Sequence, residues 1–159
     1  MQDYVDELRR TVETARVRLQ SIPDAQSAAR PAPGKWSRKE IIGHLIDSAA
    51  NNHQRFVRAS FQDALVFPGY DQDEWVRAQR YQDARWARLI DLWATYNLHV
   101  AHVMESIPAQ VRERPRTRHN LHEIAWRTVP ESQPTTLDAF MRDYVGHLKH
   151  HIDQALATR

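Results

Sequence analysis

Apolar residues recur every third or fourth position in four stretches of this 159-residue chain, and prolines lie between the stretches. This spacing places apolar side chains on one face of an α-helix, whereas a half-buried strand would show strict alternation. Proline disfavours a continuing helix at its own position and restricts the residue before it. The pattern therefore predicts four amphipathic helices, over about residues 3–22, 37–62, 82–107 and 135–155.

Two of these helices have a recognisable start. Ser37 and Glu40 have the spacing of a capping box, and Thr135 or Thr136 can cap the last helix. Bundle helices are usually joined by about two to eight residues. The connection over 109–134 is longer, so we expect it to cross the bundle or to carry function. Together these features predict a single all-α domain over 1–159, a four-helix bundle with a long connection between its third and fourth helices.

The composition excludes several classes of site. Because the chain has no cysteine, it cannot form a disulfide framework, a thiolate zinc site, an iron–sulfur cluster or a cysteine nucleophile. Lysine and arginine number 22 against 20 aspartates and glutamates, and this near balance argues against a nucleic-acid-binding protein. The first residues lack the apolar core of a secretion signal, and no run of about 18 apolar residues is present. We therefore expect a soluble cytoplasmic protein without a membrane partner.

Nine histidines are the unusual feature of the composition, and three of them lie close together near the end of the chain. At about 100° per residue, His147 and His151 lie roughly 40° apart on one face of the last helix, separated by one turn. His150 points away from that face. Two histidines at this spacing can bind one metal ion, as in the HExxH motif. Such pairs are also common on surfaces, and a metal would need a third ligand from another part of the chain.

That third ligand has several candidates. They are His44 in the second helix and His99 or His102 in the third. His53 follows His44 by nine residues, which places it on the opposite face of the same helix. The two therefore cannot bind one ion, and we interpret His53 as a surface or packing residue.

The face of the second helix that carries His44 is polar. His44 shares a stripe with Ser48, Asn51, Asn52 and Arg55, away from the apolar face of the helix. By periodicity alone this stripe predicts a solvated surface. The functional alternative is a polar cleft opposite the fourth helix, in which Asn51, Asn52 and Arg55 could orient an anionic substrate.

Two segments resemble the signatures of the DinB/YfiT-like superfamily of metal-dependent enzymes. The segment over 33–47, PGKWSRKEIIGHLID, is similar to the first signature, in which Lys-Trp-Ser leads into a helix whose histidine binds a metal. The run over 147–154, HLKHHIDQ, is similar to the second, His-x-x-x-His followed by a glutamine. The likeness extends from about residue 30 onward. It implies a DinB-like four-helix bundle in which His44, His147 and His151 are the three metal ligands.

The resemblance also implies a class of activity. Three imidazoles on one divalent ion leave a coordination position open, as in catalytic rather than structural zinc sites. Zinc and nickel both suit imidazole ligands. We therefore expect a metal-dependent enzyme of hydrolase or thiol-transferase type, acting on a small-molecule substrate, with a low-molecular-weight thiol as a cosubstrate in the second case.

Two other functions stay open. One is a non-catalytic metal-binding or interaction protein of the stress response. The other is a nucleic-acid-associated stress protein, suggested by the family's damage-inducible name and by the alternating Arg112, Arg114, Arg116 and Arg118, and disfavoured by the near-neutral charge. These arginines could contact phosphate, or they could belong to a solvated loop. Apolar and aromatic residues on the first helix could also support a homodimer.

Overall fold

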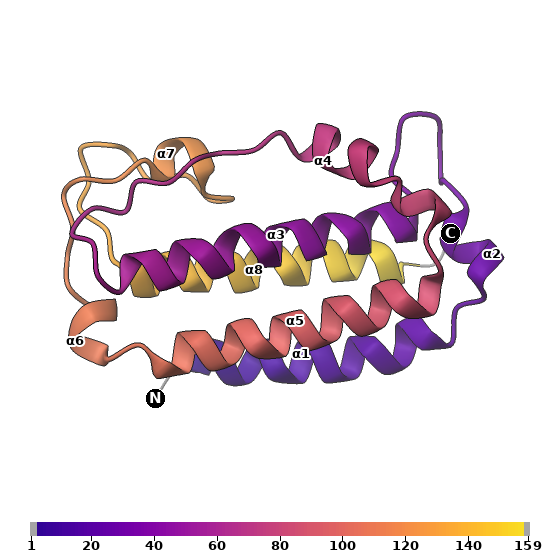
Figure 1. Cartoon of the computed structure of the whole chain (residues 1–159), viewed down its shortest axis with the longest axis horizontal. Helices are drawn as coiled ribbons and strands as arrows, with labels where there is room; N and C mark the ends of the chain where they lie inside the picture. The colour runs from indigo at the N-terminus through magenta and orange to yellow at the C-terminus, as the bar shows by residue number, and fades with distance from the viewer. Residues whose placement is uncertain (1–2, 158–159) are drawn as a thin grey trace.

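Four long helices make up most of the chain in the computed structural model, which describes residues 3–157 (Figure 1). They are α1 (Asp3–Gln20), α3 (Arg38–Ala59), α5 (Trp86–Ser106) and α8 (Leu137–Leu156). Within the described residues, extended pairing is limited to two isolated bridges, so the prediction of an all-α four-helix bundle is confirmed. None of the helices in this part of the chain is both long and apolar enough to cross a membrane.

Short helical segments fill the connections, and the apolar pattern does not predict them. They are α2 (Asp24–Ala28), α4 (Gln72–Gln79), the 3-10 turn η1 (Tyr81–Asp83), α6 (Ala109–Arg112) and α7 (Leu121–Ile124). They also shorten the predicted long helices. The third helix is expected from about residue 82, but Arg80 adopts a left-handed conformation with φ of 51° and residues 81–83 form the 3-10 turn. As a result, α5 begins only at Trp86.

Both predicted helix starts are confirmed. Ser37 Oγ accepts a hydrogen bond from the Glu40 backbone N–H at 3.2 Å, and the Glu40 carboxylate accepts one from the Ser37 backbone N–H at 2.8 Å. The same carboxylate pairs with Arg30. At the start of α8, Thr136 Oγ1 accepts from the Ala139 backbone N–H at 3.0 Å. These bonds satisfy amides that have no partner within the helix.

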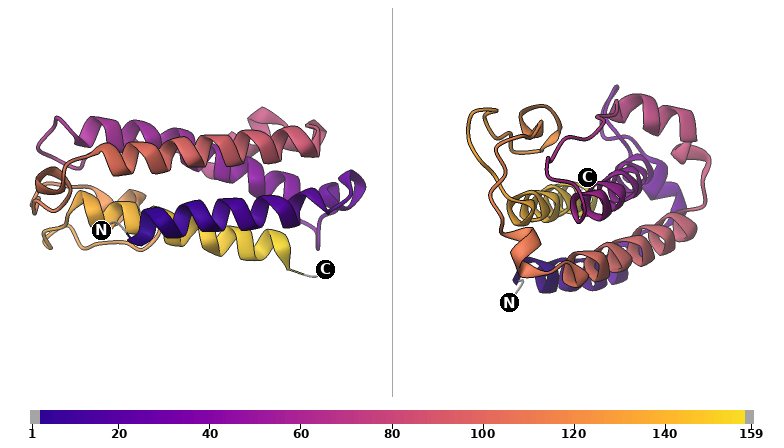
Figure 2. Two further views of the ribbon diagram at one scale, coloured as in Figure 1. Left: turned by 90° about the horizontal axis from the view of Figure 1, so that it is seen from below. Right: turned by 60° about the vertical axis from the view of Figure 1, so that its left-hand side comes forward.

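Consecutive long helices along the chain do not always run in opposite directions. α1 and α8 run one way along the bundle, whereas α3 and α5 run the other way (Figures 1 and 2). α3 packs against α5 and α8, and α1 packs against the same two helices. Because α3 and α5 are parallel, the chain must return along the bundle between them, and residues 60–85 make this return. This is a second long connection, in addition to the predicted one between α5 and α8.

The two long connections are joined to each other. The Leu65 backbone N–H donates to Arg118 O at 3.0 Å, and the Asn120 backbone N–H donates to Leu65 O at 3.1 Å. The Asn120 side chain accepts from the Phe67 backbone N–H at 3.1 Å and donates to Phe67 O at 2.9 Å. We refer to residues 65–72 and 119–126 as the roof, because they cover one side of α3 and α8 (Figure 1).

α3 and α8 pack against each other through an aromatic core. The ring of Phe56 lies edge-on to Phe140 and Tyr144, with centroids 5.7 Å apart in both pairs. Burying a side chain of this kind stabilises a fold by about 1.5–3 kcal/mol. The hydroxyl group of Tyr144 donates a hydrogen bond to Asn97 Oδ1 on α5 at 2.5 Å. The core therefore fixes α8 against both α3 and α5.

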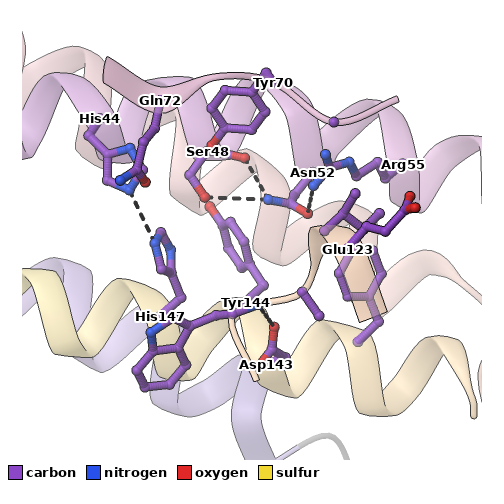
Figure 3. Close-up of a pocket in the computed structure, with 15 residues that line it drawn as sticks. His44, Ser48, Asn52, Arg55, Tyr70, Gln72, Glu123, Asp143, Tyr144 and His147 are labelled. Atoms are coloured by element: carbon purple, nitrogen blue, oxygen red, sulfur yellow. Dashed lines mark hydrogen bonds between the residues drawn. The ribbon is translucent and has the colours of Figure 1, made fainter. Parts of the chain in front are cut away.

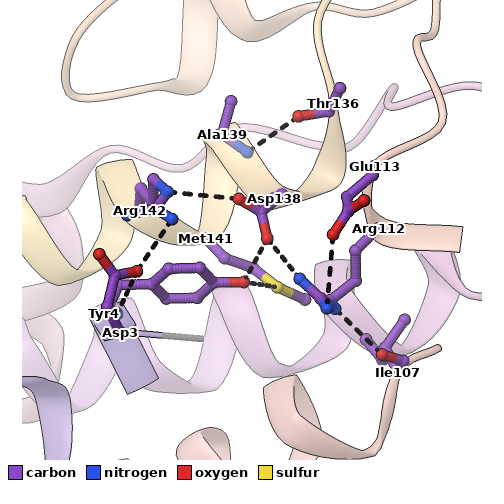
Figure 4. Close-up of polar contacts among 10 residues, drawn as sticks. All are labelled: Asp3, Tyr4, Ile107, Arg112, Glu113, Thr136, Asp138, Ala139, Met141 and Arg142. Carbon is purple, nitrogen blue, oxygen red and sulfur yellow. Dashed lines mark hydrogen bonds and ion pairs between the residues drawn. The ribbon is translucent and has the colours of Figure 1, made fainter. Parts of the chain in front are cut away.

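Asp138 joins three helices at the end of the bundle where α1 and α8 begin (Figure 4). Its carboxylate accepts hydrogen bonds from the Tyr4 hydroxyl at 2.8 Å and from Arg142 Nε at 3.3 Å, and it pairs with Arg112 of α6. Arg142 also pairs with Asp3 at 2.9 Å. This network anchors the start of the connection between α5 and α8.

The alternating arginines divide between interior and surface. Arg112 and Arg116 are buried, and Arg116 donates to two backbone carbonyls at 3.2 Å. Arg114 and Arg118 are exposed. Because two of the four arginines are buried, the four do not form a continuous phosphate-binding face.

Gly43, one residue before His44, gives a test of how tightly the bundle is packed. A Cβ atom at this position would lie 2.1 Å from Tyr81 Cδ2, in a buried ring whose hydroxyl donates to Asp47 at 2.6 Å. Replacing a helical glycine with alanine usually stabilises by about 1 kcal/mol, whereas overpacking costs about 1–3 kcal/mol. With this contact so short, we expect Gly43→Ala to lower the free energy of urea unfolding by roughly 1–2 kcal/mol.

Gly69→Ala is the matched control, because its Cβ would meet Ile124 at an ordinary 3.7 Å. We expect its unfolding free energy to stay within about 0.5 kcal/mol of wild type. A more stable Gly43→Ala protein would show that the ring of Tyr81 is not held against α3.

Candidate metal centre

The antiparallel packing of α3 and α8 brings together three histidines from distant parts of the sequence. His44 lies in α3, and His147 and His151 lie one turn apart in α8. The ring centroids are 5.1 Å apart for His44 and His147, 4.8 Å for His44 and His151, and 4.6 Å for His147 and His151. The three ring planes are nearly perpendicular to one another, at 75–82°. The three rings therefore form one compact cluster between α3 and α8.

The spacing of the ring nitrogens fits a divalent metal ion. One nitrogen from each of the three rings lies within 4.8 Å of the other two, and His44 Nε2 is 3.1 Å from His147 Nε2. Zinc–nitrogen bonds of about 2.0–2.1 Å in a tetrahedral arrangement separate two ligand nitrogens by roughly 3.3 Å. Small side-chain adjustments would bring the rings to this spacing.

The electrostatic environment keeps these imidazoles neutral. Burial lowers the pKa of His44 to about 3, and the neighbouring His151 contributes further. Burial lowers the pKa of His147 to about 3 as well, together with repulsion from the surrounding histidines. The pKa of His151 is also lowered by burial. Neutral imidazole is the form that binds metals, so the site is prepared for a cation rather than for protons.

Gln154 orients one of the three rings. Its Oε1 lies 2.9 Å from His151 Nδ1, and its Nε2 lies 3.1 Å from His150 Nε2. Because an amide oxygen only accepts, His151 Nδ1 carries the proton and Nε2 is left with its lone pair. A partner of this kind fixes both the tautomer and the direction of a metal-binding histidine. His150 itself is exposed and lies outside the cluster.

A cleft of about 230 Å³ extends from His44 and His147 along α3 (Figure 3). Its lining comes from α3, α8 and the roof: His44, Ser48, Asn52, Arg55, Gly69, Tyr70, Gln72, Glu123, Ile124, Ala125, Trp126, Phe140, Asp143, Tyr144 and His147. The polar stripe on α3 is thus a covered surface rather than a solvated face. Asn52 is 7% exposed and Arg55 is 5% exposed.

Of the three residues expected to line a substrate cleft, two line it and one does not. Asn52 and Arg55 line it, and Arg55 donates to Asn52 Oδ1 at 3.3 Å. Asn51 is half-buried, is not part of the lining, and donates to Asp47 O at 2.9 Å. A difference of one residue on a helix rotates a side chain by about 100°, which is enough to move it out of the cleft.

The remaining histidine candidates lie on another face of the bundle. His53 Nδ1 is 3.2 Å from the Tyr96 hydroxyl, and its ring centroid is 5.0 Å from that of His99. His99 in turn neighbours His102 at 6.2 Å. These residues are separated from the cluster of His44 and the two histidines of α8, as the phase of His53 on α3 predicts.

Several lining residues carry no signal in the sequence. Tyr70, Gln72 and Trp126 belong to the roof, where no periodicity indicates which way a side chain points. Tyr144 could have been found, because it precedes His147 by three residues and so shares its face of α8. Asp143 holds the roof in place by accepting the Trp126 backbone N–H at 2.8 Å.

Comparison with known proteins gives a consistent result. The sequence profile of the DinB superfamily matches residues 7–155. Among solved structures, the chain is similar to YfiT from Bacillus subtilis, described as a probable metal-dependent hydrolase with an unusual four-helix bundle topology. The TM-score is 0.71 at 19% sequence identity, and the match covers 94% of this chain and 82% of YfiT, so it shows a shared fold. Among curated protein sequences, none matches the chain.

The buried histidines predict how stability depends on pH. The pKa of His44 is about 3 in the folded protein, whereas the unfolded value is about 6.5. The stability that comes from a neutral His44 is therefore fully present above about pH 6.5 and is lost progressively as the pH falls toward about 3. In metal-free protein, the free energy of urea unfolding should fall more steeply between pH 6.5 and 4 than in His44→Gln, by up to about 1.4 kcal/mol per pH unit. Parallel curves would contradict a buried, neutral His44.

Proposed function

The chain belongs to the DinB superfamily, and on that premise we propose that it is a metal-dependent enzyme whose divalent ion, zinc or nickel, is held by His44, His147 and His151. The observation that carries the proposal is the convergence of three imidazole nitrogens within 4.8 Å at one end of a covered polar cleft. All three side chains are histidines with lowered pKa values, which suits a borderline metal ion better than a hard oxygen-ligated one.

The shape of the site supports catalysis rather than a structural role. A structural zinc site is usually closed by four protein ligands, whereas a catalytic site keeps one position open. Here the described residues offer three histidine ligands, and two of them, His44 and His147, also line the cleft. A divalent ion in such a site polarises a substrate oxygen and lowers the pKa of a water or thiol.

The residues of the chain would then hold and orient the substrate. The three histidines supply the ligands, and Gln154 fixes the tautomer of His151. Residues of the roof line one side of the cleft, and Trp126 forms part of this wall beside His147, with ring centroids 6.1 Å apart. We place hydrolysis first, because YfiT, which has the same fold, is described as a probable hydrolase. Thiol transfer, with a low-molecular-weight thiol as cosubstrate, is the second candidate.

The ligand set can be tested by removing one histidine at a time. His44→Ala, His147→Ala and His151→Ala should each weaken metal binding by more than about 100-fold, since even indirect partners of a ligand contribute about 10- to 100-fold. The measurement is elemental analysis and equilibrium dialysis with zinc and with nickel, on protein purified without a histidine tag.

The matched controls lie on the same two helices. His53→Ala on α3 and His150→Ala on α8 should keep the wild-type metal content, because neither residue contributes a ring nitrogen to the cluster of His44, His147 and His151. Loss of metal in His150→Ala together with retention in His147→Ala would overturn the assignment.

Activity needs a separate experiment. Protein loaded with zinc or nickel is assayed with a panel of carboxylic esters and amides, and separately with cysteine plus an electrophilic aryl chloride. We expect turnover in one assay that disappears in metal-free protein and in His151→Ala. Stoichiometric metal without turnover in either assay would favour the alternative, a non-catalytic metal-binding or interaction protein.

A further inference from the structure

Arg55 is a buried cation that has only neutral partners in the described part of the chain. It is 5% exposed, and no aspartate or glutamate among residues 3–157 forms an ion pair with it. Its guanidinium donates to Pro68 O at 2.9 Å and to Asn52 Oδ1 at 3.3 Å, both uncharged acceptors. Burying a charge is costly unless it is paired. The positive charge of Arg55 is therefore not neutralised by any residue in the described part of the chain.

The position of Arg55 relates it directly to the histidines. It lies eleven residues after His44 on the same stripe of α3, about three turns or roughly 16 Å between Cα atoms. Side chains on a helix lean toward its N-terminus, which brings the guanidinium closer to His44. Ser48 and Asn52 lie between the two residues and line the same cleft. Figure 3 shows the Arg55 side chain reaching toward Asn52 and Tyr70, with its guanidinium carbon 5.8 Å from the Tyr70 ring centroid.

The carboxylates that line the cleft are engaged elsewhere. Asp143 accepts the backbone N–H groups of Trp126 and Arg127 at 2.8 and 2.9 Å, so it serves to hold the roof. The side chain of Glu123 is 64% exposed at the rim and lies 3.6 Å from His122. Neither forms an ion pair with Arg55. The far end of the cleft thus presents a guanidinium whose hydrogen-bond acceptors are both neutral.

We propose that Arg55 is the anion-recognition residue of the cleft, binding the carboxylate or phosphate end of an elongated small molecule whose reacting group lies at the histidines. A guanidinium suits both anions, because its planar fork donates two parallel hydrogen bonds. The substrate class named here rests on the proposed function, whereas anion binding by Arg55 does not depend on a metal. The bond to Pro68 O also ties the roof to α3, so Arg55 positions one wall of the site that it serves.

The first experiment measures anion binding to metal-free protein at constant ionic strength. Inorganic phosphate is titrated by calorimetry into wild type, Arg55→Met and Arg58→Met. Arg58 lies on the same helix and is exposed, so it controls for net charge. We expect the phosphate dissociation constant to rise about tenfold or more in Arg55→Met, the scale of one lost charge-assisted hydrogen bond. It should change by less than about twofold in Arg58→Met. Equal effects of the two substitutions would overturn the proposal.

A second variant covers the case in which Arg55→Met does not fold. Asn52→Asp keeps the size of the side chain and places a carboxylate next to the guanidinium, where Asn52 Oδ1 now lies at 3.3 Å. This internal ion pair should compete with external anions and weaken phosphate binding by about tenfold or more, while Arg55 stays in place. A folded Asn52→Asp protein that binds phosphate as tightly as wild type would contradict the assignment.

The third measurement uses protein loaded with zinc and tests the length of the substrate. Glutarate, pimelate and azelate are compared with pentanoate, heptanoate and nonanoate as matched monocarboxylates. A dicarboxylate that reaches from the histidines to Arg55 should bind about tenfold more tightly than its matched monocarboxylate, and Arg55→Met should remove this advantage while the metal content stays full. If no dicarboxylate binds more tightly than its matched monocarboxylate at any chain length, the proposal of an elongated substrate is wrong. Failure of wild type to hold zinc would instead count against the proposed function, and the phosphate titration would still decide the role of Arg55.

Discussion

The antiparallel contact between α3 and α8 is the interaction on which the candidate site depends. At one end of this contact, Phe56 packs against Phe140 and Tyr144. At the other end, His44 meets the two histidines of α8. Burial and mutual repulsion disfavour the charged forms of these imidazoles, so their pKa values are lowered and the rings are neutral near pH 7. The aromatic packing of the same helix pair holds these histidines together, and Phe140 and Tyr144 also line the cleft beside them.

Much of the bundle can be predicted from the sequence because its helices carry strong local signals. The apolar spacing, the prolines and the capping box of Ser37 and Glu40 indicate where the long helices lie, within a few residues. Helical phase separates His147 and His151 from His150, and it separates His44 from His53. Phase alone does not choose between His44 and the histidines of the third helix; the resemblance to a known family does. The choice agrees with the cluster that the structure forms.

What the sequence does not show is how tertiary structure covers a polar surface. The stripe with Asn52 and Arg55 has the pattern of a solvated face, and it would be one if the roof were absent. Periodicity describes a helix in isolation and contains no information about a connection that passes over it. The same reason explains Arg112 and Arg116, which look like part of a basic loop but are buried by contacts with distant backbone and side chains. In both cases the deciding contacts join residues far apart in the chain.

The parallel arrangement of α3 and α5 has a consequence for how a cleft arises in a helical protein. Two consecutive long helices that point the same way oblige the chain to travel back along the bundle, whatever the intervening residues are. Here that obligatory return supplies one wall of the cleft and needs no additional domain or sheet. The length of this connection is set by the helices, but most of its side chains do not have to pack in the core of the bundle. Connectivity alone therefore separates the helices that bring the three histidines together from a wall of the cleft whose side chains can change without disturbing that cluster.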